Sequence, residues 1–424
     1  NEENLRPAFF NRTQNIRVDA TIDPLPGLSI NLHALHEKNQ RTEMQYMFEG
    51  MPSTGGGSFA MSIISFSSAF EHATASNNYH SAAFTHLQTY REEIANRVRT
   101  QYTATHYPSR GFLSETSLSG EPFNPTVGDV QRNAADVLIP SFLAAYTGKD
   151  PAKIGLGAFP NVSSMLPNWH VTYNMATAFP ALQTYLRSLT FHHQYLSQYR
   201  IGSFGSFLSW IAADDDNELG FIRDAVSGVP LPSSPFDISS VSIVESFNPL
   251  IEMRSVFLND LNLGLRLNRT RTVNLNLSSV QIVETSDNDL VVGLGYRIAH
   301  FDHIIGIGSQ SNTGTRRLSS SVQGAQRPEA DNSASQFNND LNIKLDISHK
   351  LTRTLIRKIE SGFTQAIGGI QTTSIRFAAD YAMSRQTTLR AFYDKVLNKP
   401  LVSSGTYATA NTSAGISLRF NLNQ

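Results

Sequence analysis

The chain lacks cysteine, long apolar runs and an excess of charge of either sign. Among its 424 residues there is no cysteine, which excludes a disulfide framework, a thiolate metal site and a cysteine nucleophile. It contains no run of about 18 apolar residues, the length that marks a membrane-spanning helix, so a helical membrane protein is excluded. Its 34 basic residues balance 35 acidic ones without forming blocks, which argues against nucleic acid as a partner.

Catalytic and cofactor-binding motifs are also missing. There is no Gly-x-Ser-x-Gly elbow, no phosphate-binding glycine loop and no pair of carboxylates placed for acid–base work. His192 and His193 are adjacent and would point to opposite faces of a strand, so they cannot share one metal ion. His300 and His303 stand where a strand gives way to a loop, and their role stays open. We therefore expect no enzyme, no cofactor and no metal site.

Alternation of apolar and polar residues is what the sequence does contain. Residues 413–420 close the chain with Ile416, Leu418 and Phe420 on one face of a strand and polar side chains on the other. The run also fits the polar-x-Gly-x-x-apolar-x-aromatic pattern that ends many bacterial outer-membrane β-barrels, with Gly415, Leu418 and Phe420 as the candidate assembly signal. The last edge strand of a soluble sandwich would alternate in the same way.

The same alternation recurs along the chain and predicts roughly fifteen strands. Residues 261–267 and 273–277 predict a hairpin with a tight polar turn at 269–271. Tight turns are also expected at 55–57 and 384–386, and long polar loops at 214–240 and 309–339. Short turns at one end and long loops at the other are typical of outer-membrane barrels. Further strands are expected at 28–32, 44–48, 59–63, 169–175, 189–202, 290–298, 341–348, 374–381 and 389–393.

One part of the chain has a different pattern. Residues 79–100 carry apolar side chains at spacings of three and four, which predicts an amphipathic helix, and the following residues are rich in Pro, Gly, Ser and Asn. Residues 353–367 fit a helix or a strand. The sequence thus predicts barrel strands in 1–70, a helix and loop insertion in 71–168 that serves as a cap or lumen element, and barrel strands in 169–424. The predicted fold class is an all-β transmembrane antiparallel barrel.

Six segments carry a further signal: residues 136–151, 166–173, 247–251, 291–297, 391–396 and 415–420. In this order they are similar to the C-terminal region of the SprA/Sov family, the outer-membrane translocon of the type IX secretion system of Bacteroidota. The resemblance spans most of the chain from about residue 79 onward. Because that family forms an exceptionally large single-chain barrel, it implies that these 424 residues are one part of a longer polypeptide.

The resemblance implies a channel in the cell outer membrane that passes folded cargo proteins with C-terminal targeting domains to the cell surface and supports gliding motility in some relatives. The partners it implies are the remainder of the same translocon polypeptide, a PorV-type barrel shuttle protein, a plug subunit, secreted cargo proteins and outer-membrane lipid. A wide lumen needs a polar inner face. The candidate lumen-facing residues are Asn262, Arg266, Asn274, Asn276, Arg376 and Arg390.

Two other functions fit the same alternation. A smaller outer-membrane porin or uptake channel would show the terminal signal but would not need the insertion at 71–168. A soluble β-rich adhesin or carbohydrate-binding module would be released without detergent.

Overall fold

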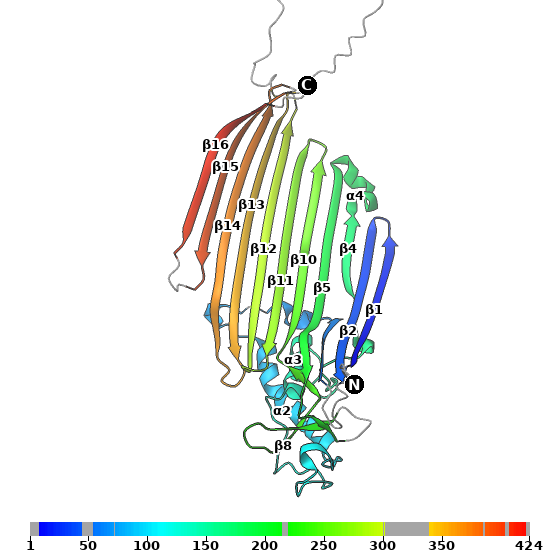
Figure 1. The fold of residues 1–424 in the computed structure, drawn as a ribbon. Coiled ribbons are helices and arrows are strands. Elements are labelled where there is room, and N and C mark those ends of the chain that lie inside the picture. The colour runs from blue at the N-terminus through cyan, green and yellow to red at the C-terminus, as the bar shows by residue number, and fades with distance from the viewer. Residues whose placement is uncertain are drawn as a thin grey trace, which may run out of the picture.

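The computed structural model describes residues 8–44, 54–71, 73–213, 219–299, 301, 339–384, 386–402 and 407–420. It is mostly antiparallel β-sheet, with 57% of residues in strands and 16% in helices. The described part contains no helix that is both long and apolar enough to cross a membrane. The main sheet follows the order β1-β2-β3-β5-β10-β11-β12-β13-β14-β15-β16. Figure 1 shows β1 and β16 at its two edges.

The strands of this sheet are long and mostly paired with their sequence neighbours. From β10 to β16 each strand pairs antiparallel with the next one, and the pairing of β11 with β12 continues without a register shift from residue 261 to residue 276. The bounds are β1 Ala8–Leu25, β2 Leu28–Met44, β3 Thr54–Ser62, β4 Asn168–Asn174, β5 Leu186–Ser206, β10 Ser240–Phe257, β11 Leu261–Asn276, β12 Gln281–Ile298, β13 Leu341–Lys358, β14 Thr364–Ala382, β15 Thr387–Pro400 and β16 Thr409–Phe420.

Strands β3 and β4 occupy one shared position between β2 and β5. Strand β2 pairs with β4 over residues 28–33 and with β3 over residues 36–43, while β5 pairs with β4 and then with β3 in the same way. At their junction the Asn168 amide donates to Ser62 Oγ at 3.2 Å, and the backbone N–H of Leu166 donates to the Ser62 carbonyl at 3.2 Å. Residues 63–167 are therefore looped out of a single strand position.

The looped-out segment forms a helical unit at one end of the long strands (Figure 1). It contains α1 Phe66–Ala69, α2 Ala82–Tyr102 and α3 Ala135–Thr147, and a small sheet of β6 Ile211–Ala212, β7 Gly220–Arg223 and β8 Pro230–Ser233 adjoins it. The helix predicted at 79–100 is thus present as α2, which begins at a capping serine, Ser81.

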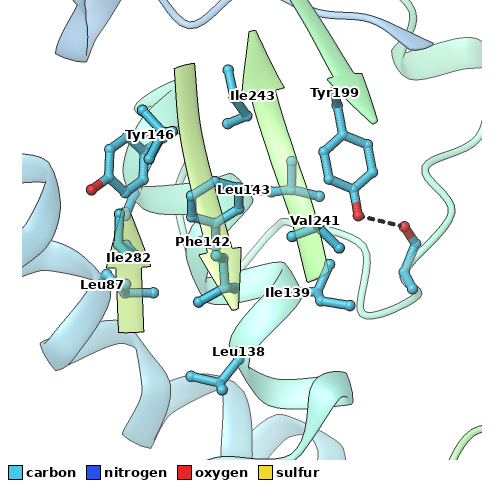
Figure 2. Packing of buried hydrophobic residues seen from close by; sticks show 14 of the residues in the cluster. Leu87, Leu138, Ile139, Phe142, Leu143, Tyr146, Tyr199, Val241, Ile243 and Ile282 are labelled. Carbon is cyan, nitrogen blue, oxygen red and sulfur yellow. Dashed lines mark hydrogen bonds between the residues drawn. The ribbon is translucent and has the colours of Figure 1, made fainter. Parts of the chain in front are cut away.

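The main hydrophobic core lies between this helical unit and the ends of the long strands. Figure 2 shows α3 presenting Phe142 and Leu143 to Val241 of β10 and to Ile282 of β12, with Leu87 of α2 beside them. Phe142, Leu87 and Ile282 have no exposed surface. The helical unit is therefore packed onto the sheet and is not a loose loop.

Several local predictions are wrong. Residues 269–271 are not a turn, because β11 continues through them to Asn276. Residues 55–57 lie in β3, and residues 214–240 include β7, β8 and the short strand β9 Phe236–Ile238. Residues 353–367 divide between the end of β13, a turn and the start of β14. The long strands β1 and β10 have no counterpart among the predicted strands.

The expected separation of short and long connections is also wrong. Ile298 and Tyr381 both pair with Leu341, so the long connection between β12 and β13 begins and ends at the same sheet end as the tight turn at 384–386, where Thr387 N–H donates to the Ser384 carbonyl. The helical unit occupies the other end. Residues 302–338, which hold His303 and nearly all of the predicted polar loop, lie outside the described residues, as do His300 and most of the strand predicted at 44–48.

Candidate functional site: the two faces of the sheet

The register of the long strands creates one continuous apolar surface. Leu261, Leu263 and Leu265 of β11 pair with Tyr296, Leu294 and Val292 of β12, and cross-strand partners share a face. The same face continues across β13 to β16. We call this surface the apolar belt: residues 261, 263, 265 and 267 of β11, 290, 292, 294 and 296 of β12, 341, 343, 345 and 347 of β13, 375, 377, 379 and 381 of β14, 389, 391 and 393 of β15, and 414, 416, 418 and 420 of β16.

Large apolar side chains of the apolar belt are exposed on the surface of the described chain. Leu294 is 40% exposed, Ile347 39% and Ile416 76%, although residues of these types are usually buried. A soluble protein rarely exposes a contiguous apolar surface of this extent. The apolar belt therefore calls for a covering that the described chain does not supply.

The apolar belt has a constant height on neighbouring strands. On β11, β12, β13 and β14 it covers seven residues, which corresponds to about 20 Å at roughly 3.3 Å per residue. At the sheet end away from the helical unit it finishes in an aromatic side chain on three strands, Tyr296, Tyr381 and Phe420, and in a leucine on the other three. A narrow apolar band with an aromatic rim is the pattern of a strand surface that meets a lipid bilayer.

The opposite face of the sheet is polar. All six candidate lumen residues lie on it: Asn262, Arg266, Asn274 and Asn276 alternate with the leucines of β11, Arg376 pairs with Asp346, and Arg390 pairs with Asp380. Charged side chains on this face pair with one another. Glu252 accepts from Arg266 at 2.8 Å, and Arg390 lies 3.6 Å from Asp380.

A hollow of about 500 Å³ interrupts this polar face. Its floor is formed where Gly264 and Gly293 pair directly and no side chain projects from either strand. Asn262, Arg266 and Lys344 lie around it. The two candidate residues Asn262 and Arg266 are thereby brought to one site, whereas Asn274 and Asn276 lie at the far end of β11.

The three residues of the candidate assembly signal divide between the faces. Leu418 and Phe420 belong to the apolar belt and are 50% and 61% exposed. Gly415 points to the polar face opposite Phe392, and a Cβ there would lie 3.0 Å from the Phe392 ring. The aromatic ring therefore occupies the space above the glycine, as aromatic partners of strand glycines do.

Below the apolar belt the same face continues under the helical unit, and buried ion pairs lie there. Arg271 of β11 is 3.1 Å from Glu245 of β10, and their side chains are 4% and 1% exposed. Ser65 and Tyr195 both donate hydroxyl hydrogen bonds to Glu245, at 2.8 Å and 2.9 Å. Arg271 also donates to Ser68 Oγ of α1 at 2.8 Å. This network joins the helical unit to three strands.

A second buried pair repeats the arrangement two strands away. Arg357 of β13, 1% exposed, is 3.0 Å from Glu284 of β12 and donates to the Tyr79 carbonyl at 2.7 Å. The residues of these two buried ion pairs were not among the site residues predicted from the sequence. The available signal is that Glu245, Arg271 and Arg357 fall at positions where the alternation of their strands calls for apolar side chains.

Ion pairs of the helical unit lower the pKa of two carboxyl groups. Hydrogen bonds from Arg99 hold the pKa of Asp129 below its usual value. A hydrogen bond from Arg91 of α2 likewise lowers the pKa of Glu360, in the turn after β13. The Arg91–Glu360 pair joins α2 to the turn after β13, whereas the Arg99–Asp129 pair lies within the looped-out segment. Because both carboxylates are partly exposed, each pair contributes little compared with the buried pairs.

Within the described residues no group of three or more His, Asp and Glu side chains is placed to hold a metal ion. His192 contacts Thr172 on one face, while His193 Nδ1 lies 2.6 Å from the Leu250 carbonyl. No family model matches the chain, and a search of curated proteins found no match.

Proposed function

We propose that this chain is one section of the wall of a large β-barrel in the cell outer membrane, and that the barrel is a non-enzymatic protein-conducting channel of the SprA/Sov type. The observation that carries the proposal is that one face of the sheet carries an exposed apolar belt while the other carries charged and polar side chains. Lipid is the covering that suits the apolar belt, and a water-filled lumen suits the polar face.

The open edges of the sheet favour a large barrel over a small one. Among the described residues β1 pairs only with β2, and β16 only with β15. Unpaired strand edges are not tolerated in the hydrocarbon of a bilayer. Further strands, supplied by the remainder of the translocon polypeptide, would close the wall. A smaller porin or uptake channel, the second candidate, would have to join β1 directly to β16.

The same assignment places the helical unit outside the lumen. It covers the face that carries the apolar belt, next to Val241, Arg271 and Ile282, and not the face of Asn262 and Arg266. Under this proposal it lies on the outer side of the wall beyond the lipid, in place of the predicted cap or lumen element. That position suits contact with a neighbouring barrel such as a PorV-type shuttle protein.

Phe420→Asp is expected to block assembly into the outer membrane, because it puts a charge at the aromatic rim of the apolar belt. Immunoblots of membrane fractions measure the result. Ser417→Asp is the matched control, since Ser417 points to the polar face of the same strand and should assemble normally. Normal amounts of inserted Phe420→Asp protein would count against an assembly role for this residue.

Depletion of the protein separates the two candidate functions. For a translocon, cargo proteins with C-terminal targeting domains are expected to accumulate in the periplasm in folded form, with small-solute uptake unchanged. A porin predicts the reverse. Secretion that continues at full rate after depletion would refute the translocon proposal.

A further inference from the structure

Four cationic side chains and one histidine border the apolar belt on the side toward the helical unit. They come from alternate strands: Arg269 of β11, His349 and Arg353 of β13, and Lys395 and Lys399 of β15. Cross-strand pairing puts all five on the face of the apolar belt, since Leu290 pairs with His349 and Ile375 with Lys395. We call this group the basic collar. His349 and Lys399 are exposed, and Arg269, Arg353 and Lys395 are half-buried.

The basic collar contains no acidic side chain. The described residues of β11 to β16 that lie in register with residues 265–271 of β11 form this level of the sheet. On the face of the apolar belt these residues are apolar, neutral polar or cationic, and none is acidic. At the same level the opposite face mixes both signs, with Asp287 3.9 Å from Lys350 and Asp289 3.4 Å from Asn268. A surface of one sign is therefore specific to the face of the apolar belt.

The arginines of the collar also differ from those deeper under the helical unit. Arg271 and Arg357 each have a carboxylate partner, Glu245 and Glu284. Arg269 and Arg353 have none among the described residues. Instead each guanidinium lies over an aromatic ring of the helical unit, Arg269 5.0 Å from the centre of Phe70 and Arg353 5.8 Å from that of Tyr79. The rings hold the cations in place without neutralising them.

We propose that the basic collar binds the phosphate groups of the membrane lipids that cover the apolar belt. This inference rests on the proposed function, because lipid headgroups lie directly beside the apolar belt only if that surface faces hydrocarbon. Anionic headgroups attract nearby Lys and Arg side chains, and Arg holds phosphate in bidentate geometry. The collar then fixes the height of the wall in the bilayer on the side of the helical unit.

The test uses the complex extracted from membranes and exchanged into nanodiscs of phosphatidylcholine with phosphatidylglycerol. Native mass spectrometry counts the lipids that stay bound. Removing four collar charges together, by Arg269→Gln, Arg353→Gln, Lys395→Gln and Lys399→Gln, is expected to weaken phosphatidylglycerol binding roughly several hundredfold, since each cation near a lipid surface is worth about fivefold and the four factors multiply. The matched control removes four charges from the opposite face: Lys344→Gln, Lys350→Gln, Lys358→Gln and Arg419→Gln.

Retention equal to wild type in the collar variant would overturn this inference and leave the membrane wall intact. An equal loss in the control would also overturn it, because the effect would then follow net charge and not position. A wild-type protein that retains no lipid of either kind would refute both the collar and the wall. The double variant Lys395→Gln with Lys399→Gln, both on β15, repeats the test if the fourfold variant fails to fold, with a partial loss expected.

Discussion

Glu245→Ala is expected to destabilise the packing of the helical unit on the sheet by about 3–5 kcal/mol. The substitution leaves Arg271, 4% exposed, without its carboxylate partner, and it also removes the acceptor of the Ser65 and Tyr195 hydroxyls. An unpaired buried charge costs far more than an exposed ion pair contributes. Hydrogen exchange of α1 to α3 measures the effect as lost protection.

Two further variants sharpen this test. Replacing the buried pair together, by Glu245→Leu with Arg271→Met, is expected to recover most of the lost protection, because a packed apolar pair avoids the desolvation cost of two charges. Asp260→Ala removes an ion pair with Arg187, whose side chain is 53% exposed, and should change protection by less than about 1 kcal/mol. Unchanged protection of the helices in Glu245→Ala would show that the pair does not hold the unit to the sheet.

Leu263→Lys is expected to destabilise the inserted protein by about 2–4 kcal/mol, because it places a cation in the middle of the surface that we propose faces lipid. Its neighbour Asn262 points to the other face of β11, so Asn262→Lys is a matched control that should be nearly neutral. The measurement is the amount of each variant that inserts and resists urea extraction from outer membranes. Equal tolerance of lysine at both positions would indicate that both faces meet water.

Alternation in the sequence was sufficient to assign side chains to faces. The alternate leucines of residues 261–267 and the run 413–420 occupy the faces that their patterns predict, because an antiparallel strand keeps its side-chain period of two over its whole length. The turn at residues 384–386 was also predictable, since it lies between two clear alternating runs. The alternation of apolar and polar residues is enough to predict these strand faces and this turn, because neither depends on contacts with distant parts of the chain.

The errors arise where distant parts of the chain decide the local structure. Residues 269–271 looked like a polar turn, but Arg271 is a strand residue whose charge is balanced by Glu245 and covered by α1. Gly57 lies within strand β3, next to the backbone of Asn39. A Cβ at this position would come within 2.0 Å of the Asn39 carbonyl oxygen, so the close approach of two strands, and not a turn, requires glycine here. Glu245 and Asn39, the residues that explain these two positions, both lie well away from them in the sequence.

The position of the helical unit was equally hidden. The sequence indicates that residues 71–168 interrupt the strands, but not that β3 and β4 share one strand position or which face the helices cover. That face is set by contacts between α3 and strands β10 and β12, which are separated from it by about a hundred residues or more. It follows that the common face of the six candidate residues was predictable from alternation, while the buried ion pairs were not.

A wall section of a membrane channel must have its apolar belt in lipid and its opposite face in water. Because these 424 residues contain no cysteine, a single substitution puts one labelling site in this section of the polypeptide, and the unsubstituted protein gives the background. In native outer membranes Asn262→Cys and Arg376→Cys are expected to react with a membrane-impermeant maleimide, whereas Leu294→Cys and Ile347→Cys react only after denaturation. Labelling of Leu294→Cys and Ile347→Cys as fast as Asn262→Cys would contradict the account, because a sheet that is wet on both faces is not the wall of a membrane channel.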